Sequence, residues 1–503
     1  MKKMVKLAPM WLLDRIENSI LDDYEKTRKF LQGSDPELLE AISQKKAMAA
    51  FRRAARKVPA YKKFLKEHNL KPGQVKNMEF FDGIVPITDK DRYVRKYSIE
   101  SRCTGGKFPK AGNIDESSGS TGVPTNWIRS VKEEEKLTKT IRFLFRHIIG
   151  EGDYMVISCW SSGAWATGVK FCELVERFAL VKNVGTDIDK TIKTLQAFGP
   201  DKRYLIAGYP QYLKELVERK ELDWKKYRID MLTGGDGTAI GWEEQIRNEL
   251  GRKEAKIVSA YGSSDIDIGV ANETPLTQKI RKRCAEDEEL CKALFGDPRR
   301  VPMLFQYNPM MHYIQNKVVK GKREFVITAL DRKIASPKIK YAMHDEGGVL
   351  RYKEMMQKLE RHGVKVEEDM RLPFLYVYGR SDGTISLDGA NVFPEQVERS
   401  ILENKELADR MNNYMIEKAY DKRHKARFIV HIELMKGTRA GPELKRSFGR
   451  AILKGLLRLN ADYKESYENN KSLKPNVELY KMDSGPFAVD NLRLKHKFIL
   501  QHE

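Results

Sequence analysis

The sequence predicts an α/β protein with a large amino-terminal domain, a β-rich subdomain inside it, and a small α+β carboxy-terminal domain. Between residues 154 and 262, short apolar runs alternate with segments of helical periodicity. This alternation is typical of a parallel sheet that helices cover on both faces. After residue 300 strand-like runs such as EFVITAL dominate, and the last part combines RFIVHIEL with a helix around 442–460.

The length indicates more than one domain, because 503 residues exceed what a single hydrophobic core usually holds. We place the two domains at residues 1–379 and 380–503, with the boundary close to Gly379. Residues 1–75 are expected to form a helical lead-in, which contains the run LLEAISQKKAMAAFRRAARKV. The segment PITDKDR predicts a further helix, with Thr88 or Asp89 as its cap.

The stretch ESSGSTGVPT, residues 116–125, combines hydroxyl side chains with two glycines. Glycine allows positive φ and lets backbone N–H groups approach an anion closely, so the stretch is typical of a polyphosphate-binding loop. It is not a Walker A loop, because no Gly-Lys-Ser/Thr follows and the alternating TNWIR after it predicts a strand. The alternative is an ordinary solvated Ser/Gly turn.

Beyond this loop, Ser130 and Glu133 predict a capping box for a helix that ends at Gly150. The predicted strands then cover 154–160, 203–209, 229–235 and 256–262, and the predicted helices lie near 169–181, 187–198, 210–220 and 241–251. Ligands of open parallel sheets gather at the carboxyl ends of the strands. Candidate site residues stand at all four ends: Trp160, Tyr209, Gly234, Gly235, Asp236, Tyr261, Gly262, Ser263, Ser264 and Asp265.

Composition argues against several other classes of protein. No apolar run approaches the roughly 20 residues of a membrane span, so we expect no membrane partner. The five cysteines are an odd number without a CxxC pair, which favours free thiols and a cytoplasmic location. Zinc at Cys284 and Cys291 is a weak alternative.

The charge is strongly basic, with 92 Lys and Arg against 71 Asp and Glu. Nine basic residues and no acidic residue lie between Lys45 and Lys66. Such a surface either binds nucleic acid or attracts anionic substrates such as ATP. No interleaved aromatic pattern, helix-turn-helix or zinc finger accompanies it, so we expect no nucleic-acid partner.

Several separated motifs agree in order with a known family. They are VPAYKKF, VPITDKDRY, ESSGSTGVPTNW, TGGDGT, AYGSSD, ITALDRKIASPKIKYAMHDEG and YGRSDGTISLDGANVFPEQVE. On these motifs the chain resembles the adenylate-forming superfamily of acyl-CoA synthetases, and within it the phenylacetate–coenzyme A ligase branch. The resemblance covers nearly the whole chain.

The resemblance implies a two-step reaction that uses ATP, Mg²⁺ and coenzyme A. A carboxylate attacks the α-phosphate of ATP to give an acyl-adenylate and pyrophosphate, and a thiol then displaces AMP. It also implies ATP-binding roles for the residues of the glycine-rich loop: Ser117, Ser118, Gly119, Ser120, Thr121 and Gly122. Asp345 and Arg380 would bind the ribose. The segment from Gly234 to Asp236 would bind the adenine, and the ring of Tyr261 would take part in stacking.

Asp265 would hold Mg²⁺ on the phosphates, with Asp267 as a rival ligand. The family usually has Glu where Asp236 and Asp265 stand, so the shorter side chains need a water to reach their partners. The resemblance also implies a catalytic lysine near the carboxyl end. Leu494 replaces the glycine that normally precedes it, so both Lys495 and Lys497 stay candidates.

The acyl pocket is expected to contain Trp160, Trp165, Tyr209 and Tyr212, which suit an apolar acid but equally suit ordinary core packing. Asp382 matches the family's hinge position, about which a mobile carboxy-terminal domain rotates between the two half-reactions; the alternative is an Asp-Gly turn.

We therefore expect a ligase that joins a small carboxylic acid to coenzyme A. Transfer to a carrier-protein thiol or an amine is one alternative, and a basic nucleic-acid-binding protein on a disabled ligase scaffold is another. Whether the protein forms a homodimer stays open.

Overall fold

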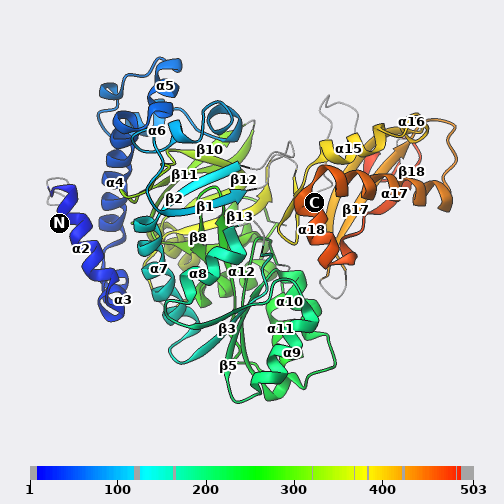
Figure 1. Cartoon of the computed structure of the whole chain (residues 1–503), viewed down its shortest axis with the longest axis horizontal. Helices are drawn as coiled ribbons and strands as arrows, with labels where there is room; N and C mark the ends of the chain where they lie inside the picture. The colour runs from blue at the N-terminus through cyan, green and yellow to red at the C-terminus, as the bar shows by residue number, and fades with distance from the viewer. Residues whose placement is uncertain are drawn as a thin grey trace.

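The computed structural model describes residues 8–117, 125–162, 166–238, 240–298, 300–319, 321–367, 369–381, 384–421, 425–482 and 484–488. We call residues 8–381 the main body and residues 384–488 the carboxy-terminal unit. Figure 1 shows the amino-terminal helices on one side of the molecule and the carboxy-terminal unit on the other.

One mixed sheet of eleven strands runs through the main body, in the order β10-β11-β12-β13-β9-β8-β7-β6-β5-β3-β4. Strands β7, β6, β5, β3 and β4 are parallel, and the pairs from β7 to β10 are antiparallel. The strands are β3 (Tyr154–Ser158), β4 (Leu180–Asn183), β5 (Arg203–Gly208), β6 (Arg228–Gly234), β7 (Ile257–Ser263), β8 (Asp267–Asn272), β9 (Met303–Tyr307), β10 (His312–Val319), β11 (Lys322–Ala329), β12 (Tyr341–Leu350) and β13 (Phe374–Arg380). The β-rich part of the sequence thus continues the same sheet.

A separate hairpin, β1 (Gly112–Ser117) and β2 (Thr125–Ser130), lies outside this sheet. Helices surround both. They are α2 (Met10–Leu21), α3 (Tyr24–Gly33), α4 (Pro36–Lys57), α5 (Pro59–Glu67), α6 (Met78–Ile84), α7 (Val131–Leu144), α8 (Ala166–Val175), α9 (Ile188–Phe198), α10 (Pro210–Val217), α11 (Trp242–Leu250), α12 (Pro275–Glu286), α13 (Glu288–Phe295) and α14 (Tyr352–Arg361). In the described ranges no helix is long and apolar enough to cross a membrane.

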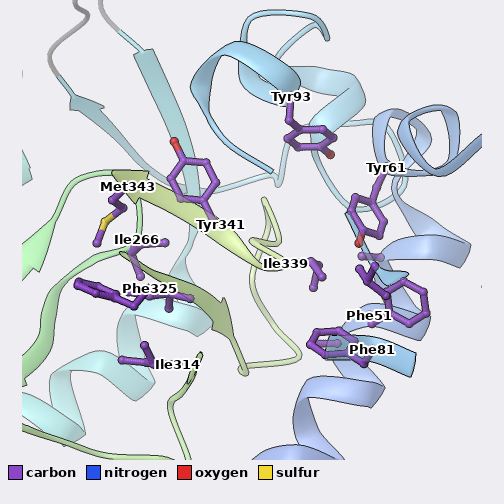
Figure 2. Packing of buried hydrophobic residues seen from close by; sticks show 14 of the residues in the cluster. Phe51, Tyr61, Phe81, Tyr93, Ile266, Ile314, Phe325, Ile339, Tyr341 and Met343 are labelled. Carbon is purple, nitrogen blue, oxygen red and sulfur yellow. The ribbon is translucent and has the colours of Figure 1, made fainter. Parts of the chain in front are cut away.

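The main body is held together by two large hydrophobic clusters. One surrounds the parallel strands, and the other joins helices α4, α5 and α6 to the antiparallel strands. Figure 2 shows part of the second cluster, with Phe51, Tyr61 and Phe81 on the helical side and Ile314, Phe325 and Tyr341 on the strand side. The antiparallel strands are therefore fixed in place next to the parallel half.

The carboxy-terminal unit has its own sheet, of order β16-β17-β18, and its own hydrophobic cluster. Its elements are β14 (Ile385–Leu387), β15 (Ala390–Val392), α15 (Pro394–Leu402), α16 (Lys405–Ala408), β16 (Met411–Tyr420), β17 (Ala426–Leu434), α17 (Pro442–Leu459), α18 (Ala461–Asn469) and β18 (Asn476–Tyr480). Every residue of that cluster lies between Ile385 and Leu479.

The four predicted parallel strands and their helices are present. The helix expected after Asp89 is present as one wide turn, Lys90–Val94, and Asp89 caps it by accepting the N–H of Arg92 at 2.6 Å. Two other local expectations need correction. The helix predicted to reach residue 181 ends at Val175, and Leu180–Asn183 forms the edge strand β4. The capping box is half formed: Ser130 accepts the N–H of Glu133, but the Glu133 carboxylate accepts the N–H of Ala335, at 2.7 Å.

Candidate functional site

The glycine-rich stretch connects the two strands of the β1–β2 hairpin, as the alternation around it predicted. Ser117 and Thr125 are paired across the hairpin, at the two ends of the connection. Residues 118–124, which include the predicted Ser118, Gly119, Ser120, Thr121 and Gly122, lie outside the described residues. The described strand β2 contacts the loop that follows β7, because Trp127 and Arg129 donate hydrogen bonds to residues of that loop.

Asp265, in that loop, is a buried carboxylate with several donors around it. The Trp127 indole donates to it at 3.0 Å, the Tyr341 hydroxyl donates at 2.9 Å, and the Lys90 ammonium lies 3.5 Å away. Burial acts to raise the pKa of Asp265, but Lys90 and the hydrogen bonds from Tyr341 and Trp127 outweigh it and hold the pKa below its usual value. An ionised carboxylate beside the start of the glycine-rich stretch has the donor chemistry that Mg²⁺ prefers.

The rival Asp267 lies in a different environment. Its carboxylate is 3.5 Å from the Lys170 ammonium, and it accepts the N–H of Ile268 at 2.8 Å. Among the described residues, no three His, Cys, Asp or Glu side chains form a group that could hold a metal ion by themselves. Mg²⁺ in phosphate sites commonly takes only one or two carboxylates from the protein, the rest of its shell coming from phosphates and water.

Three residues predicted to bind ATP meet at the carboxyl end of β7. Asp345 on β12 is the direct cross-strand partner of Arg380 on β13. The Arg380 guanidinium lies 3.5 Å from the Asp345 carboxylate, and the Tyr261 hydroxyl donates to the same carboxylate at 2.5 Å. Burial and the Asp345 charge raise the pKa of Tyr261 well above its usual value, so the hydroxyl stays protonated. The register of two strands thus creates one polar cluster.

The segment Gly234–Asp236 ends β6 and contacts the carboxy-terminal unit. Gly235 has a φ of 75°, and a Cβ there would lie 3.0 Å from the Tyr209 ring. The Ser386 hydroxyl donates to the Gly235 carbonyl at 3.1 Å, and Lys418 forms an ion pair with Asp236. The segment that is expected to bind the adenine therefore also contacts the carboxy-terminal unit.

The expected acyl-pocket residues are brought together beside this segment. Trp160 and Tyr209 pack edge to face, with ring centroids 4.9 Å apart. The Tyr212 hydroxyl is 2.8 Å from the hydroxyl of Thr191, so this polar tip is already bonded within the protein. Trp165 lies outside the described residues. Tyr209 and Tyr212 line a pocket together with Ser161 and with Asp388 and Asn470 of the carboxy-terminal unit.

An unpredicted arginine joins the hairpin to the loop after β7. Arg129 on β2 is fully buried and donates to the Asp115 carboxylate at 2.7 Å. It also donates to the carbonyls of Ser264, at 2.7 Å, and Ile266, at 2.8 Å. Lys170 contacts the same Asp115 at 3.1 Å. The sequence signal was an arginine and an aspartate at inward positions of two short strands, which is unusual unless they pair.

No protein-family model matches the chain. In sequence it is 24% identical, over 424 residues, to a phenylacetate-coenzyme A ligase of Aromatoleum evansii, covering 82% of this chain and 86% of that one. In structure it matches 2-hydroxyisobutyryl-CoA ligase in complex with 2-HIB-AMP and CoA in the thioesterification state, with a TM-score of 0.64 at 15% identity, over 93% of this chain and 90% of that one. A postadenylation-state structure of that ligase, in complex with R3-HIB-AMP, gives 0.53 at the same identity and coverage.

The chain has the fold of the adenylate-forming ligases. The resemblance of its motifs to that superfamily, and to the phenylacetate–coenzyme A ligase branch, is thereby confirmed. The α/β fold class is confirmed as well. Three further candidates, Asp382, Lys495 and Lys497, lie outside the described residues of this adenylate-forming ligase fold, so their roles stay predictions.

Within this ligase fold, a half-buried histidine joins the Asp345 strand to the end of the main body. His344 lies between Glu324, at 3.3 Å, and Asp89, at 3.7 Å. Ser381, the last described residue before Asp382, donates its N–H to the His344 carbonyl at 2.7 Å and its hydroxyl to Glu324 at 2.5 Å. Hydrogen bonds with Asp89 and Glu324 raise the pKa of His344 to about 9, although burial opposes them.

We expect the unfolding free energy to decrease as pH rises toward 9 because of His344. An unfolded histidine has a pKa of about 6.5, so the folded chain holds this proton more tightly. The stabilisation is complete below the unfolded pKa and is lost as the pH passes through the folded value of about 9. Because the side chain is 32% exposed, solvent screening reduces the effect to about 1–2 kcal/mol.

Urea unfolding of the wild type and of His344→Asn, at pH 6 and at pH 9.5, measures this effect. Asparagine tolerates the positive φ of 60° at this position. The variant should lose less stability than the wild type between the two pH values. Equal losses in both proteins would contradict the assignment.

Proposed function

We propose that the protein is an ATP-dependent ligase that activates a carboxylic acid as an acyl-adenylate and transfers the acyl group to coenzyme A. The observation that carries this proposal is the cluster of Tyr261, Asp345 and Arg380. It lies at the carboxyl end of β7, in the loop region that Arg129 ties to the hairpin with the glycine-rich stretch. The residues proposed to bind the polyphosphate, the ribose and the metal ion would thus act in one region, which supports the two-step chemistry.

The residues of the main body would bind and orient the nucleotide. The Asp345 carboxylate offers acceptors for the two ribose hydroxyls, and the Arg380 guanidinium adds donors on the same side. Backbone N–H groups and hydroxyls of the glycine-rich stretch, from Ser117 to Gly122, would hold the phosphates that leave as pyrophosphate. Asp265 would hold Mg²⁺, which when bound neutralises phosphate charge.

We further propose two domains, 1–379 and 380–503, with the catalytic lysine in the second and a hinge at Asp382. The separate hydrophobic cluster of the carboxy-terminal unit supports this division. The bonds that hold Ser381 to His344 and Glu324 support a hinge immediately after it, because a rotating segment needs a fixed neighbour.

The acid would lie against Trp160 and Tyr209, whose buried rings favour an apolar substrate. The relative from Aromatoleum evansii, a phenylacetate-coenzyme A ligase, supports an aromatic acid and coenzyme A as acceptor. A carrier-protein thiol or an amine is the alternative acceptor. The net charge of +21 would attract anionic substrates.

ATP–pyrophosphate exchange tests the proposal without assuming the acceptor. We expect Mg²⁺-dependent exchange with at least one acid among phenylacetate, benzoate, 2-hydroxyisobutyrate and straight-chain acids. Replacing Mg²⁺ by EDTA should abolish it. Coenzyme A should then release AMP and a thioester with the best acid. Normal ATP binding without exchange for any acid would contradict the proposed function, and exchange without thioester formation would favour the alternative acceptors.

A further inference from the structure

A buried ion pair joins the carboxy-terminal unit to the main body. Lys418, near the end of β16, contacts Asp236, two residues after the end of β6, and the two residues lie 182 positions apart in the sequence. Their side chains are only 13% and 10% exposed. Burial acts to lower the pKa of Lys418, but the Asp236 carboxylate outweighs it and keeps the lysine charged. The pair is therefore an ionic contact shielded from solvent.

The same short segment receives further contacts from the carboxy-terminal unit. The Tyr420 hydroxyl donates to the Gly237 carbonyl at 3.1 Å, and Ser386 donates to the Gly235 carbonyl. Gly389 packs so closely on Tyr209 that a Cβ there would lie 2.5 Å from the ring. These contacts converge on the ends of β5 and β6, which form one place where the unit is fixed to the main body.

This arrangement also creates a pocket that neither part has alone. Ser161, Tyr209 and Tyr212 line it from the main body, and Asp388, Ser466 and Asn470 line it from the carboxy-terminal unit. The chain in this arrangement gives the higher TM-score with the thioesterification-state structure of 2-hydroxyisobutyryl-CoA ligase, 0.64 against 0.53. The pocket exists only while the two parts stay together.

We propose that Lys418 is a positioning residue for the second half-reaction: through Asp236 it fastens the carboxy-terminal unit in the arrangement that forms the thioester. This inference rests on the proposed function. Removing one partner of a buried pair leaves an uncompensated charge in that arrangement alone. The proposed hinge at Asp382 would place the carboxy-terminal unit differently for adenylation, so we expect that step not to need the pair.

The test separates the two half-reactions in the full-length chain. Lys418→Met should slow single-turnover thioester formation from preformed acyl-adenylate and coenzyme A by at least tenfold. Its ATP–pyrophosphate exchange should stay within twofold of the wild type, which also shows that the variant folds. The acid used is the one with the fastest exchange in the panel above.

Lys425→Met is the matched control. Lys425 also bridges the two parts, to Glu218 at 2.6 Å, but these side chains are 29% and 24% exposed. Solvent screens this pair more than the Lys418–Asp236 pair, so its loss should cost less and both half-reactions should remain near wild-type rates. Lys418→Arg keeps the charge and should recover thioester formation at least in part. A purely structural role of the lysine side chain would not predict this recovery.

Small-angle X-ray scattering measures the radius of gyration, and so reports on the arrangement of the two parts without any turnover. Lys418→Met should have a larger radius of gyration than the wild type, and Lys425→Met should not. Thioester formation within twofold of the wild type in Lys418→Met, or an equal loss of both half-reactions, would overturn the inference. Absence of exchange in the wild type would instead defeat the proposed function, and the scattering comparison would still decide whether Lys418 fastens the unit.

Discussion

Lys495→Ala is expected to slow adenylation by about 10²–10³-fold, the usual loss when one charged donor to a transition state is removed. Negative charge from the carboxylate and the α-phosphate crowds together in this step, and a lysine ammonium would offset it. The reaction of supplied acyl-adenylate with coenzyme A should proceed at the wild-type rate, because no phosphate is attacked there. Pyrophosphate exchange and single-turnover thioester formation measure the two steps separately.

Lys497→Ala is the control for this experiment, since it removes the same charge two residues further along the tail. We expect it to leave adenylation within a few fold of the wild type. Normal exchange in Lys495→Ala together with a large loss in Lys497→Ala would transfer the role to Lys497. Normal exchange in both would exclude the tail lysines from the chemistry.

The second large effect is expected on stability. Arg129→Met should lower the free energy of unfolding by about 3–5 kcal/mol, the range for breaking a buried ion pair from one side. Burial acts to lower the pKa of Arg129, but Asp115, Asp267 and Glu133 outweigh it, so the folded state favours the charged guanidinium. Methionine fills the space but leaves the Ser264 and Ile266 carbonyls without their donor.

Urea unfolding measures this loss, with Arg283→Met as the control. Arg283 pairs with Glu286 at 3.1 Å, but both side chains are about half exposed, at 47% and 52%. That variant should change stability by less than about 1 kcal/mol. A change of similar size in both variants would show that Arg129 does not stabilise the hairpin in the way described.

The parallel half of the sheet was predictable because its signal is local. Strands β3, β5, β6 and β7 are short apolar runs between helical segments, and each lies within two residues of its predicted range. Strand β4 was missed because the apolar run FALV, residues 178–181, was assigned to the end of the predicted helix. The strand has only four residues at the sheet edge, and Leu180 is 65% exposed. Edge position removes the burial on which such predictions depend.

The candidate site was predictable only as separate residues. The motifs indicated Asp345, Arg380 and Tyr261 one by one, and the register of β12 with β13 makes them one cluster. For Arg129 the sequence carried a local signal only for its pairing with Asp115. Its other partner Ser264, and the partner Asp236 of Lys418, lie 135 and 182 positions away. The positions of such partners are set by tertiary packing, which a single sequence does not display.

Among the described residues, the main body and the carboxy-terminal unit do not share a hydrophobic cluster, and this affects how they associate. The carboxy-terminal unit has a hydrophobic cluster made only of its own residues, and the contacts described above that join it to the main body are largely polar. A short covalent connection keeps such surfaces at an effective concentration on the order of millimolar. If the chain were cut between residues 381 and 384, the two pieces would have to find each other by diffusion at assay concentrations. The covalent connection therefore helps to stabilise the arrangement in which the carboxy-terminal unit contacts the main body.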